Sequence, residues 1–165
     1  MTEIDVQQCL QRLSGQLRQE LGASPEPPLM VGIRTGGVWL ARQLHQALEL
    51  PEPLGELDIS FYRDDFSRAG LNPRVSPSSL PFATEGRRVL LVDDIIMSGR
   101  TIRAAMNELF DYGRPEIIRL VTLVDLGGRE LPIQPDYTGE RLNLERHQRL
   151  KLRGPAPLWL ERVGV

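Results

Sequence analysis

Apolar residues recur at helical spacing in three stretches of the chain. The first covers residues 4–21, where leucines fall three or four positions apart before Gly22. The second covers residues 38–48 and is followed by a turn that contains two prolines. The third covers residues 100–112 and is followed by Gly113. Because glycine and proline stop helices, each stretch predicts an amphipathic helix with a defined end.

Short apolar runs between these helices have the length of strands. The continuous runs at 29–33, 88–93 and 116–125 predict buried strands, and the alternating run at 57–62 predicts a half-buried one. Because strands alternate with helices, the pattern indicates right-handed crossovers and a parallel sheet in an α/β fold. We expect the last of three weaker strands to close this sheet. The weaker strand signals lie near 136–139, 148–153 and 158–163.

Residues 63–84 show neither the helical nor the strand pattern of apolar residues, and they are rich in proline, serine and charged side chains. A loop of that length inside a compact domain is often an active-site lid, so we expect a lid here. The whole chain of 165 residues has the length of one domain with a sizeable core. We therefore expect a single domain over residues 1–165.

Composition narrows the functional class only a little. The net charge is −2, which does not indicate global attraction to nucleic acid, although a local basic face remains open. Cys9 is the only cysteine, which excludes an intrachain disulfide. The first residues lack the pattern of a signal peptide, and no apolar run approaches the ~20 residues that span a bilayer. We expect a cytoplasmic protein without membrane association.

The strongest chemical signal lies between residues 89 and 101. An apolar run ends in Asp93 and Asp94, and a loop with a serine and a glycine then opens the third helix. Carboxylates there can hold ribose hydroxyls, and the N–H groups of a helix start can hold a phosphate. Two further turns, at 34–37 and 125–129, also follow predicted parallel strands. Because ligands bind beyond the carboxyl ends of such strands, one cleft for a sugar phosphate is predicted.

Ordinary structural roles also explain parts of this motif. One acid can serve as a turn or capping residue, and Ser98 is a good N-cap residue for the helix that follows. The order of two acids and then Ser-Gly-x-Thr favours the binding site. Neither the Walker A pattern nor GxGxxG fits the chain, so the phosphate loop is of another kind.

Residues 89–101 resemble the type I phosphoribosyltransferase signature, in which an apolar run, two acids and a Thr-Gly-x-Thr loop follow one another. Other segments are similar, in the same order, to the PyrR family, whose members combine pyrimidine operon regulation through RNA with uracil phosphoribosyltransferase activity. The resemblance covers about residues 29–153. The further matching segments are 55–59, 62–65, 113–115, 123–125, 129–133 and 135–139.

The resemblance implies a three-layer parallel sheet of the type I phosphoribosyltransferase fold with a lid over about 63–84. It also implies a small hood, formed by about 126–165 with the N-terminal segment. Asp93, Asp94 and Arg63 would be the catalytic residues. Mg²⁺ would be bound mainly through substrate, with Asp93 and Asp94 acting on it indirectly through substrate and water.

The resemblance further implies three substrate-binding groups. Asp125 and Leu126 would lie beside the base. The pyrophosphate loop would be Arg34, Thr35, Gly36 and Gly37. The 5′-phosphate loop would contain Ile95, Met97, Ser98, Gly99, Arg100 and Thr101.

Several positions depart from the family pattern. Gly36 stands where an arginine is usual, Met97-Ser98 replaces Tyr-Thr, and Gly128 replaces a histidine. Serine keeps a hydroxyl for phosphate, whereas methionine cannot serve as an acid or base. These departures leave two hypotheses open. The first is an active uracil phosphoribosyltransferase; the second is a catalytically weak regulatory protein that senses UMP or phosphoribosyl pyrophosphate.

The resemblance implies uracil, phosphoribosyl pyrophosphate and UMP as ligands. Leader RNA of pyrimidine operons is a further partner to consider, with Arg12, Arg18, Arg146 and Lys151 as candidate phosphate contacts. Family members usually form homodimers or dimer-based tetramers, and we expect one of these states.

Overall fold

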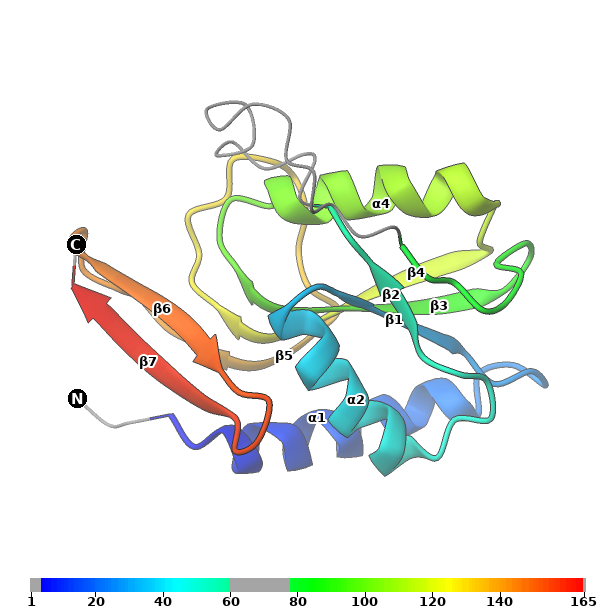
Figure 1. The fold of residues 1–165 in the computed structure, drawn as a ribbon, viewed down its shortest axis with the longest axis horizontal. Helices are drawn as coiled ribbons and strands as arrows, with labels where there is room; N and C mark the ends of the chain where they lie inside the picture. The colour runs from blue at the N-terminus through cyan, green and yellow to red at the C-terminus, as the bar shows by residue number, and fades with distance from the viewer. Residues whose placement is uncertain (1–3, 60–77, 165) are drawn as a thin grey trace.

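The structure, a computed structural model, describes residues 4–59 and 78–164, and it is an α/β fold with the predicted order of elements (Figure 1). Its helices are α1 (Val6–Leu21), α2 (Gly36–Leu48) and α4 (Arg100–Tyr112). Its strands are β1 (Leu29–Ile33), β2 (Gly55–Leu57), β3 (Arg88–Ile96), β4 (Ile117–Asp125), β5 (Tyr137–Arg141), β6 (Gln148–Arg153) and β7 (Trp159–Gly164).

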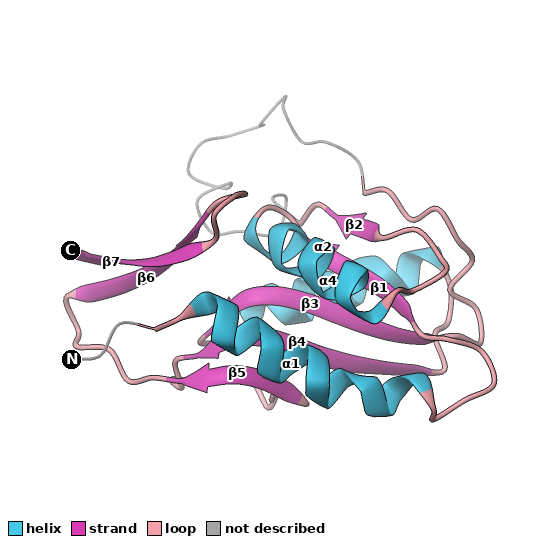
Figure 2. Ribbon diagram, turned by 90° about the horizontal axis from the view of Figure 1, so that it is seen from below, coloured by secondary structure: helices cyan, strands magenta, loops and turns pink. Residues whose placement is uncertain are grey.

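Five strands form one parallel sheet in the order β2-β1-β3-β4-β5. Helices α1 and α2 cover one face, and α4 covers the other (Figures 1 and 2). Alternate strand residues therefore enter different cores: Met30 packs with α1 and α2, whereas Leu29 and Val31 pack with α4. Both faces are buried, which explains why β1 reads as an unbroken apolar run. The three-layer α/β prediction is confirmed.

Two predicted strands have different bounds in the structure. The strand predicted at 88–93 continues to Ile96, so Asp93 and Asp94 lie inside β3 and not in a turn after it. Pairing with β4 continues to Ile96 opposite Asp125, and this ladder holds the strand extended. The strand predicted at 57–62 instead covers Gly55–Leu57, and residues 60–62 lie outside the described residues.

The prediction that residues 158–163 close the sheet is wrong. The strand β7 pairs antiparallel with β6 in a separate two-stranded sheet, and β5 is the edge of the main sheet. Leu150, Leu152 and Leu160 of this hairpin pack into the core cluster that also contains buried residues of α1 and α2. The range expected for the hood, 126–165, thus contains one strand of the main sheet, and only β6 and β7 stand apart (Figure 1).

The predicted lid is only partly described, because residues 63–77 lie outside the described ranges. Its last residues, 78–84, are attached to the domain. Ser79 and Glu56 exchange two backbone hydrogen bonds of 2.8 Å, and Leu80 and Phe82 pack against the core beside α4. Residues 78–84, the last part of the predicted lid, are therefore held against the domain.

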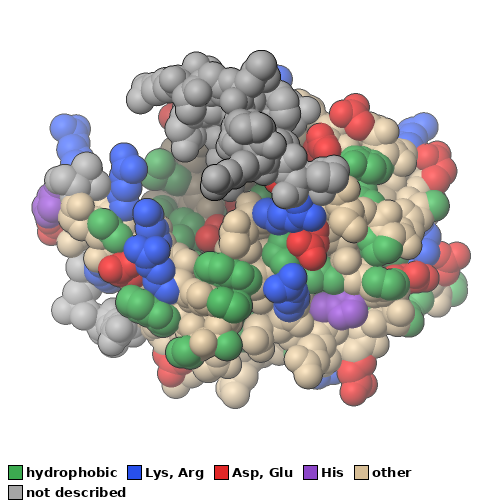
Figure 3. Space-filling model, viewed as in Figure 1, with side chains coloured by type: hydrophobic (Ala, Val, Ile, Leu, Met, Phe, Trp, Pro, Cys, Tyr) green, Lys and Arg blue, Asp and Glu red, His purple; other side chains and the backbone are tan. Residues whose placement is uncertain are grey.

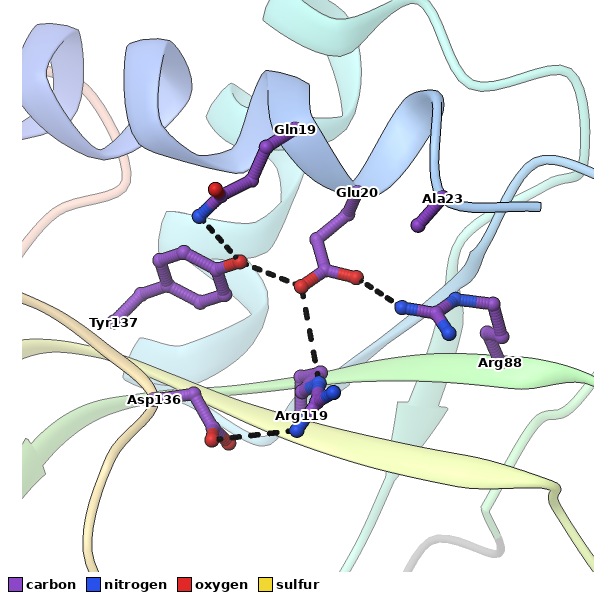
Figure 4. Close-up of a pocket in the computed structure, with 7 residues that line it drawn as sticks. All are labelled: Gln19, Glu20, Ala23, Arg88, Arg119, Asp136 and Tyr137. Carbon is purple, nitrogen blue, oxygen red and sulfur yellow. Dashed lines mark hydrogen bonds and ion pairs between the residues drawn. The ribbon is translucent and has the colours of Figure 1, made fainter.

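A charged network fastens α1 to the sheet at the end opposite the predicted site (Figure 4). Glu20, only 5% exposed, accepts hydrogen bonds of 2.5 Å from both Arg88 and Tyr137. Burial alone would raise the pKa of Glu20, but these hydrogen bonds and the charges of Arg88 and Arg119 outweigh it and hold the pKa below its usual range. Burial and the bond to Glu20 raise the pKa of Tyr137. The carboxylate of Glu20 therefore stays ionised near neutral pH.

Candidate functional site

Three turns meet at the carboxyl edge of the sheet, as the strand order predicts. They follow β1, β3 and β4, which are neighbours in the sheet. The Leu126 N–H donates to the Ile96 carbonyl at 2.9 Å, and Arg129 Nη1 donates to the Met97 carbonyl at 2.8 Å. The turn after β1 contacts the same strand, because Gly37 lies directly against Val92 and Asp93. One contiguous site is thus built from distant parts of the sequence.

The two carboxylates lie against the first residues of α2. Asp93 is 5% exposed and its Oδ1 lies near Gly37, whereas Asp94 is partly exposed and its Oδ2 faces Gly36. Because successive strand residues point to opposite sides, the two acids do not form a symmetric pair. Each is held locally: Asp93 Oδ1 accepts from the Asp94 N–H at 2.9 Å, and Asp94 Oδ1 accepts from the Ile95 N–H at 2.8 Å. The positive end of the α2 dipole favours negative charge at this place.

The carboxylate of Asp94 occupies the space that a side chain at position 36 would need. A β-carbon at position 36 would lie 2.2 Å from Asp94 Oδ2, so any side chain there requires this carboxylate to turn away. An arginine at position 36, which is usual in the family, would therefore require Asp94 to adopt another position. Arg34 does not fill the space, because its guanidinium pairs with Glu56 at 3.1 Å and Asp58 at 3.7 Å. The peptide bond between Arg34 and Thr35 is cis.

The loop before α4 presents a helix start without a side-chain cap. Gly99 is the N-cap residue, and its φ of +93° is a conformation that favours glycine. Ser98 is not the N-cap, but its Oγ accepts a hydrogen bond of 3.2 Å from the Arg100 N–H. Arg100 pairs with Glu130 at 2.8 Å, so its side chain lies toward the 126–131 loop. Main-chain N–H groups at such a helix start are suited to bind a phosphate.

Arg129 ties the loop after β4 to the loop before α4. Its guanidinium donates to Asp125 Oδ2 at 2.7 Å, to the Ile133 carbonyl at 2.7 Å and to the Met97 carbonyl at 2.8 Å. Burial alone would raise the pKa of Asp125, but the hydrogen bonds from Arg129 and the Gly127 N–H lower it. Asp125 therefore holds Arg129 in place as a carboxylate.

A pocket of about 550 Å³ lies next to these loops. Leu126, one of the two residues expected beside the base, lines it, whereas Asp125, the other, is engaged by Arg129 and is not among the lining residues. Sequence reasoning missed the far wall, which comes from residues 144–150. The alternation of polar and apolar residues in β6 is visible in the sequence, but it does not indicate that the segment before β6 lies beside Ile95. The lining residues are Ile95, Met97, Leu126, Gly127, Gly128, Leu144, Glu145, Arg146, Gln148, Arg149 and Leu150.

Of the remaining predicted residues in the described part of the chain, only Arg146 lines the pocket. Arg63 lies outside the described residues. On α1, Arg12 pairs with Glu140 at 3.0 Å, and Arg18 donates to the Ala47 carbonyl at 3.4 Å. Lys151 is exposed on β6, and Arg146 is exposed at the rim of the pocket.

Comparisons with known proteins agree with this geometry. Residues 5–152 match the family described as the phosphoribosyl transferase domain. The chain is 58% identical over 156 residues to the "Bifunctional protein PyrR" of Pseudomonas paraeruginosa, covering 94% of this chain and 92% of that protein. A protein of the same name from Pseudomonas putida is 62% identical over 138 residues, which are 84% of this chain and 80% of that protein.

Solved structures show the same fold at lower identity. A hypoxanthine phosphoribosyltransferase from Staphylococcus aureus superimposes with a TM-score of 0.66 at 24% identity, covering 87% of this chain and 77% of that one. A purine phosphoribosyltransferase from Pyrococcus horikoshii superimposes with a TM-score of 0.62 at 24% identity, covering 83% of this chain and 82% of that one. In the part of the chain that the structure describes, no helix is long and apolar enough to cross a membrane.

Proposed function

Since this chain belongs to the PyrR family of phosphoribosyltransferases, we propose that it transfers the phosphoribosyl group of phosphoribosyl pyrophosphate to uracil, and that it regulates pyrimidine genes through RNA. One observation carries the proposal. Two carboxylates and the open start of α4 meet at one sheet edge, beside a pocket of about 550 Å³. The likeness to proteins named bifunctional does not favour the alternative, a regulator that has lost turnover.

The roles follow from the positions of the groups. The loop 97–101 and the N-terminus of α4 bind the 5′-phosphate. Asp93 and Asp94 hold the ribose hydroxyls, and the start of α2 with Thr35, Gly36 and Gly37 holds the pyrophosphate. In this arrangement C1 of the sugar faces the neighbouring pocket, whose lining residues Ile95 and Leu126 would contact uracil. Positioning of the two reactants supplies much of the rate increase.

The reaction forms a bond between uracil N1 and ribose C1, breaks the bond from C1 to pyrophosphate, and passes the N1 proton to the departing pyrophosphate or to water. The transition state has oxocarbenium character, so a nearby carboxylate is suited to stabilise it. Met97 lines the pocket and offers no proton, so the chain supplies no acid or base at that position. Exclusion of water protects the electrophilic sugar from hydrolysis.

Mg²⁺ fits the donors present at this edge. Within residues 4–59 and 78–164, no group of three or more His, Cys, Asp or Glu side chains forms a metal cage. Two adjacent carboxylates instead suit a hydrated Mg²⁺ that is bound mostly by substrate oxygens. When bound, the ion would neutralise the charge of the departing pyrophosphate, with Asp93 and Asp94 holding it through substrate and water.

Steady-state kinetics with two acceptor bases test the transferase proposal. The protein is incubated with phosphoribosyl pyrophosphate, Mg²⁺ and either uracil or hypoxanthine, and nucleotide formation is followed by chromatography. We expect UMP from uracil and no IMP above background. Equal rates with hypoxanthine, or no UMP, would refute the assignment. The same assay on Asp94→Asn should give less UMP. Asp136→Asn, at the opposite end of the sheet, is its control variant and should form UMP as the wild type does.

The proposal of RNA binding rests mainly on the hairpin. Arg149, Lys151 and Arg153 alternate with buried leucines on β6, so they project from one exposed face. Figure 3 shows basic side chains gathered at the left, where β6 and β7 lie. Arg153 pairs with Glu161 across the hairpin, as Arg12 on α1 pairs with Glu140. Because Arg149 and Lys151 share one exposed face of β6, with Arg146 close in sequence, the hairpin is the better phosphate-binding face.

A gel-shift titration with pyrimidine operon leader RNA tests this face. Lys151→Gln should weaken binding and reduce the slope of log affinity against log salt by about one. Arg12→Gln is the matched control, and it should leave the slope unchanged. Binding that is insensitive to salt, or equal losses in both variants, would contradict the assignment to the hairpin.

A homodimer or dimer-based tetramer is the expected assembly. Phe110 and Tyr112 are about half exposed near the end of α4, at 55% and 48%. Large exposed aromatic side chains are typical of protein interfaces. Light scattering that gives the mass of a monomer at micromolar concentration would contradict this expectation.

A further inference from the structure

One polar group in the pocket has no partner. Gln148 lies at the start of β6 and lines the pocket together with Ile95, Met97 and Leu126. Its Oε1 is buried and has no hydrogen-bond partner among the described residues. A buried amide oxygen without a partner is unfavourable and calls for an explanation, which a bound ligand would supply. Its position suggests that the missing partner is a ligand.

The surroundings limit what that ligand is. The pocket that Gln148 lines is mostly apolar, although Glu145, Arg146 and Arg149 also line it, and apolar side chains suit the faces of a flat ring. A carbonyl oxygen can only accept a hydrogen bond, so the ring must offer an N–H. Uracil presents one, N3–H, on the edge away from the N1 atom that attacks the sugar. The terminal torsion of glutamine is soft, so a turn of the amide is enough to bring Oε1 to this edge.

We propose that Gln148 is a specificity-determining residue whose amide oxygen accepts the N3–H of the pyrimidine ring. The inference rests on the proposed uracil transfer and adds to it the residue that reads the base. Gln148 acts on the base alone, because Asp93, Asp94 and the first residues of α2 and α4, which are assigned to the ribose and the phosphates, are not among the residues that line the pocket with Gln148.

Equilibrium binding separates this role from a structural one. Titration calorimetry compares UMP, which contains the base, with ribose 5-phosphate, which does not. Gln148→Met keeps the length of the side chain but removes the acceptor, and it should weaken UMP binding by about 10- to 100-fold. Ribose 5-phosphate binding should stay within about twofold. Thermal stability should not fall, because the variant removes a buried oxygen that has no partner in the free protein.

Two further variants sharpen the test. Gln148→Glu keeps an acceptor oxygen and should retain UMP affinity to within a few fold. Gln16→Met, on the exposed side of α1, is the matched control and should bind both ligands as the wild type does.

Three results would overturn the inference. They are wild-type UMP affinity in Gln148→Met, equal losses in the Met and Glu variants, or a parallel loss of ribose 5-phosphate binding. Turnover is measured separately on the wild type. Absence of UMP formation with intact, Gln148-dependent UMP binding would refute the proposed transferase activity and leave this inference standing.

Discussion

Gly37→Ala tests the close approach of α2 to β3 that brings the pyrophosphate loop to the two acids. A β-carbon at position 37 would lie 2.7 Å from the Val92 carbonyl oxygen and 3.1 Å from Asp93 Cα. Both are backbone atoms, so no side-chain rotation relieves the contact. Either α2 must move away from the sheet or β3 must shift at Asp93.

The magnitude follows from two opposing terms. Overpacking by one carbon against backbone costs about 1–3 kcal/mol, whereas replacing a helical glycine by alanine gains at most about 1 kcal/mol. The net destabilisation is about 1–2 kcal/mol, which lowers the Tm of a chain of this length by about 2–8 °C. Because the shift falls on Asp93 and the start of α2, affinity for phosphoribosyl pyrophosphate should also fall, by about tenfold.

Thermal denaturation and ligand titration measure the two effects. Gly15→Ala is the matched control, since Gly15 is exposed within α1 and a β-carbon there meets no atom within 4 Å. That control should be more stable than the wild type by about 0.5–1 kcal/mol and should bind normally. A Gly37→Ala protein as stable as the wild type, with unchanged affinity, would refute the close packing described here.

Three further predictions concern the charged groups. Glu20→Gln should cost about 3 kcal/mol at pH 7, because Arg88 loses its buried partner; urea denaturation measures the loss. Because folding lowers the pKa of Glu20, its carboxylate stabilises the folded state fully at pH values above its unfolded pKa near 4.5. This stabilisation is lost as the pH falls through the pKa of Glu20 in the folded protein. The wild type should therefore lose stability at acid pH more steeply than Glu20→Gln does. Identical pH profiles would contradict that role. Arg129→Lys keeps the charge but not the planar fork, and it should raise the KM for phosphoribosyl pyrophosphate about tenfold; an unchanged KM would show that the Met97 contact is dispensable.

The layered fold could be predicted because its signals are local. The helices at 100–112 and 4–21 and the strand at 29–33 follow from apolar period and stop residues, and the structure places them within a few residues. The meeting of the turns at 34–37 and 125–129 follows from a general rule about parallel sheets. These steps need no knowledge of tertiary contacts.

The rest depends on packing that no local pattern encodes. The weak strand signal at residues 158–163 predicts a strand but not its partner, and β7 pairs with β6 in a hairpin whose leucines are buried in the core shared with α1 and α2. The coupling of Gly36 to Asp94 is a contact across 58 positions of sequence, visible only when α2 lies against β3. The pocket wall at 144–150 was missed for the same reason.

Binding of phosphoribosyl pyrophosphate to the intact protein tests the central claim most directly. Calorimetric titration in the presence of Mg²⁺ should show saturable binding to the wild type at one site per chain. Asp94→Asn, which removes a charge facing the start of α2 and leaves the fold in place, should weaken that binding by at least tenfold. The same affinity in both proteins would contradict the account, because the ribose and pyrophosphate would then bind elsewhere than between β3, α2 and α4.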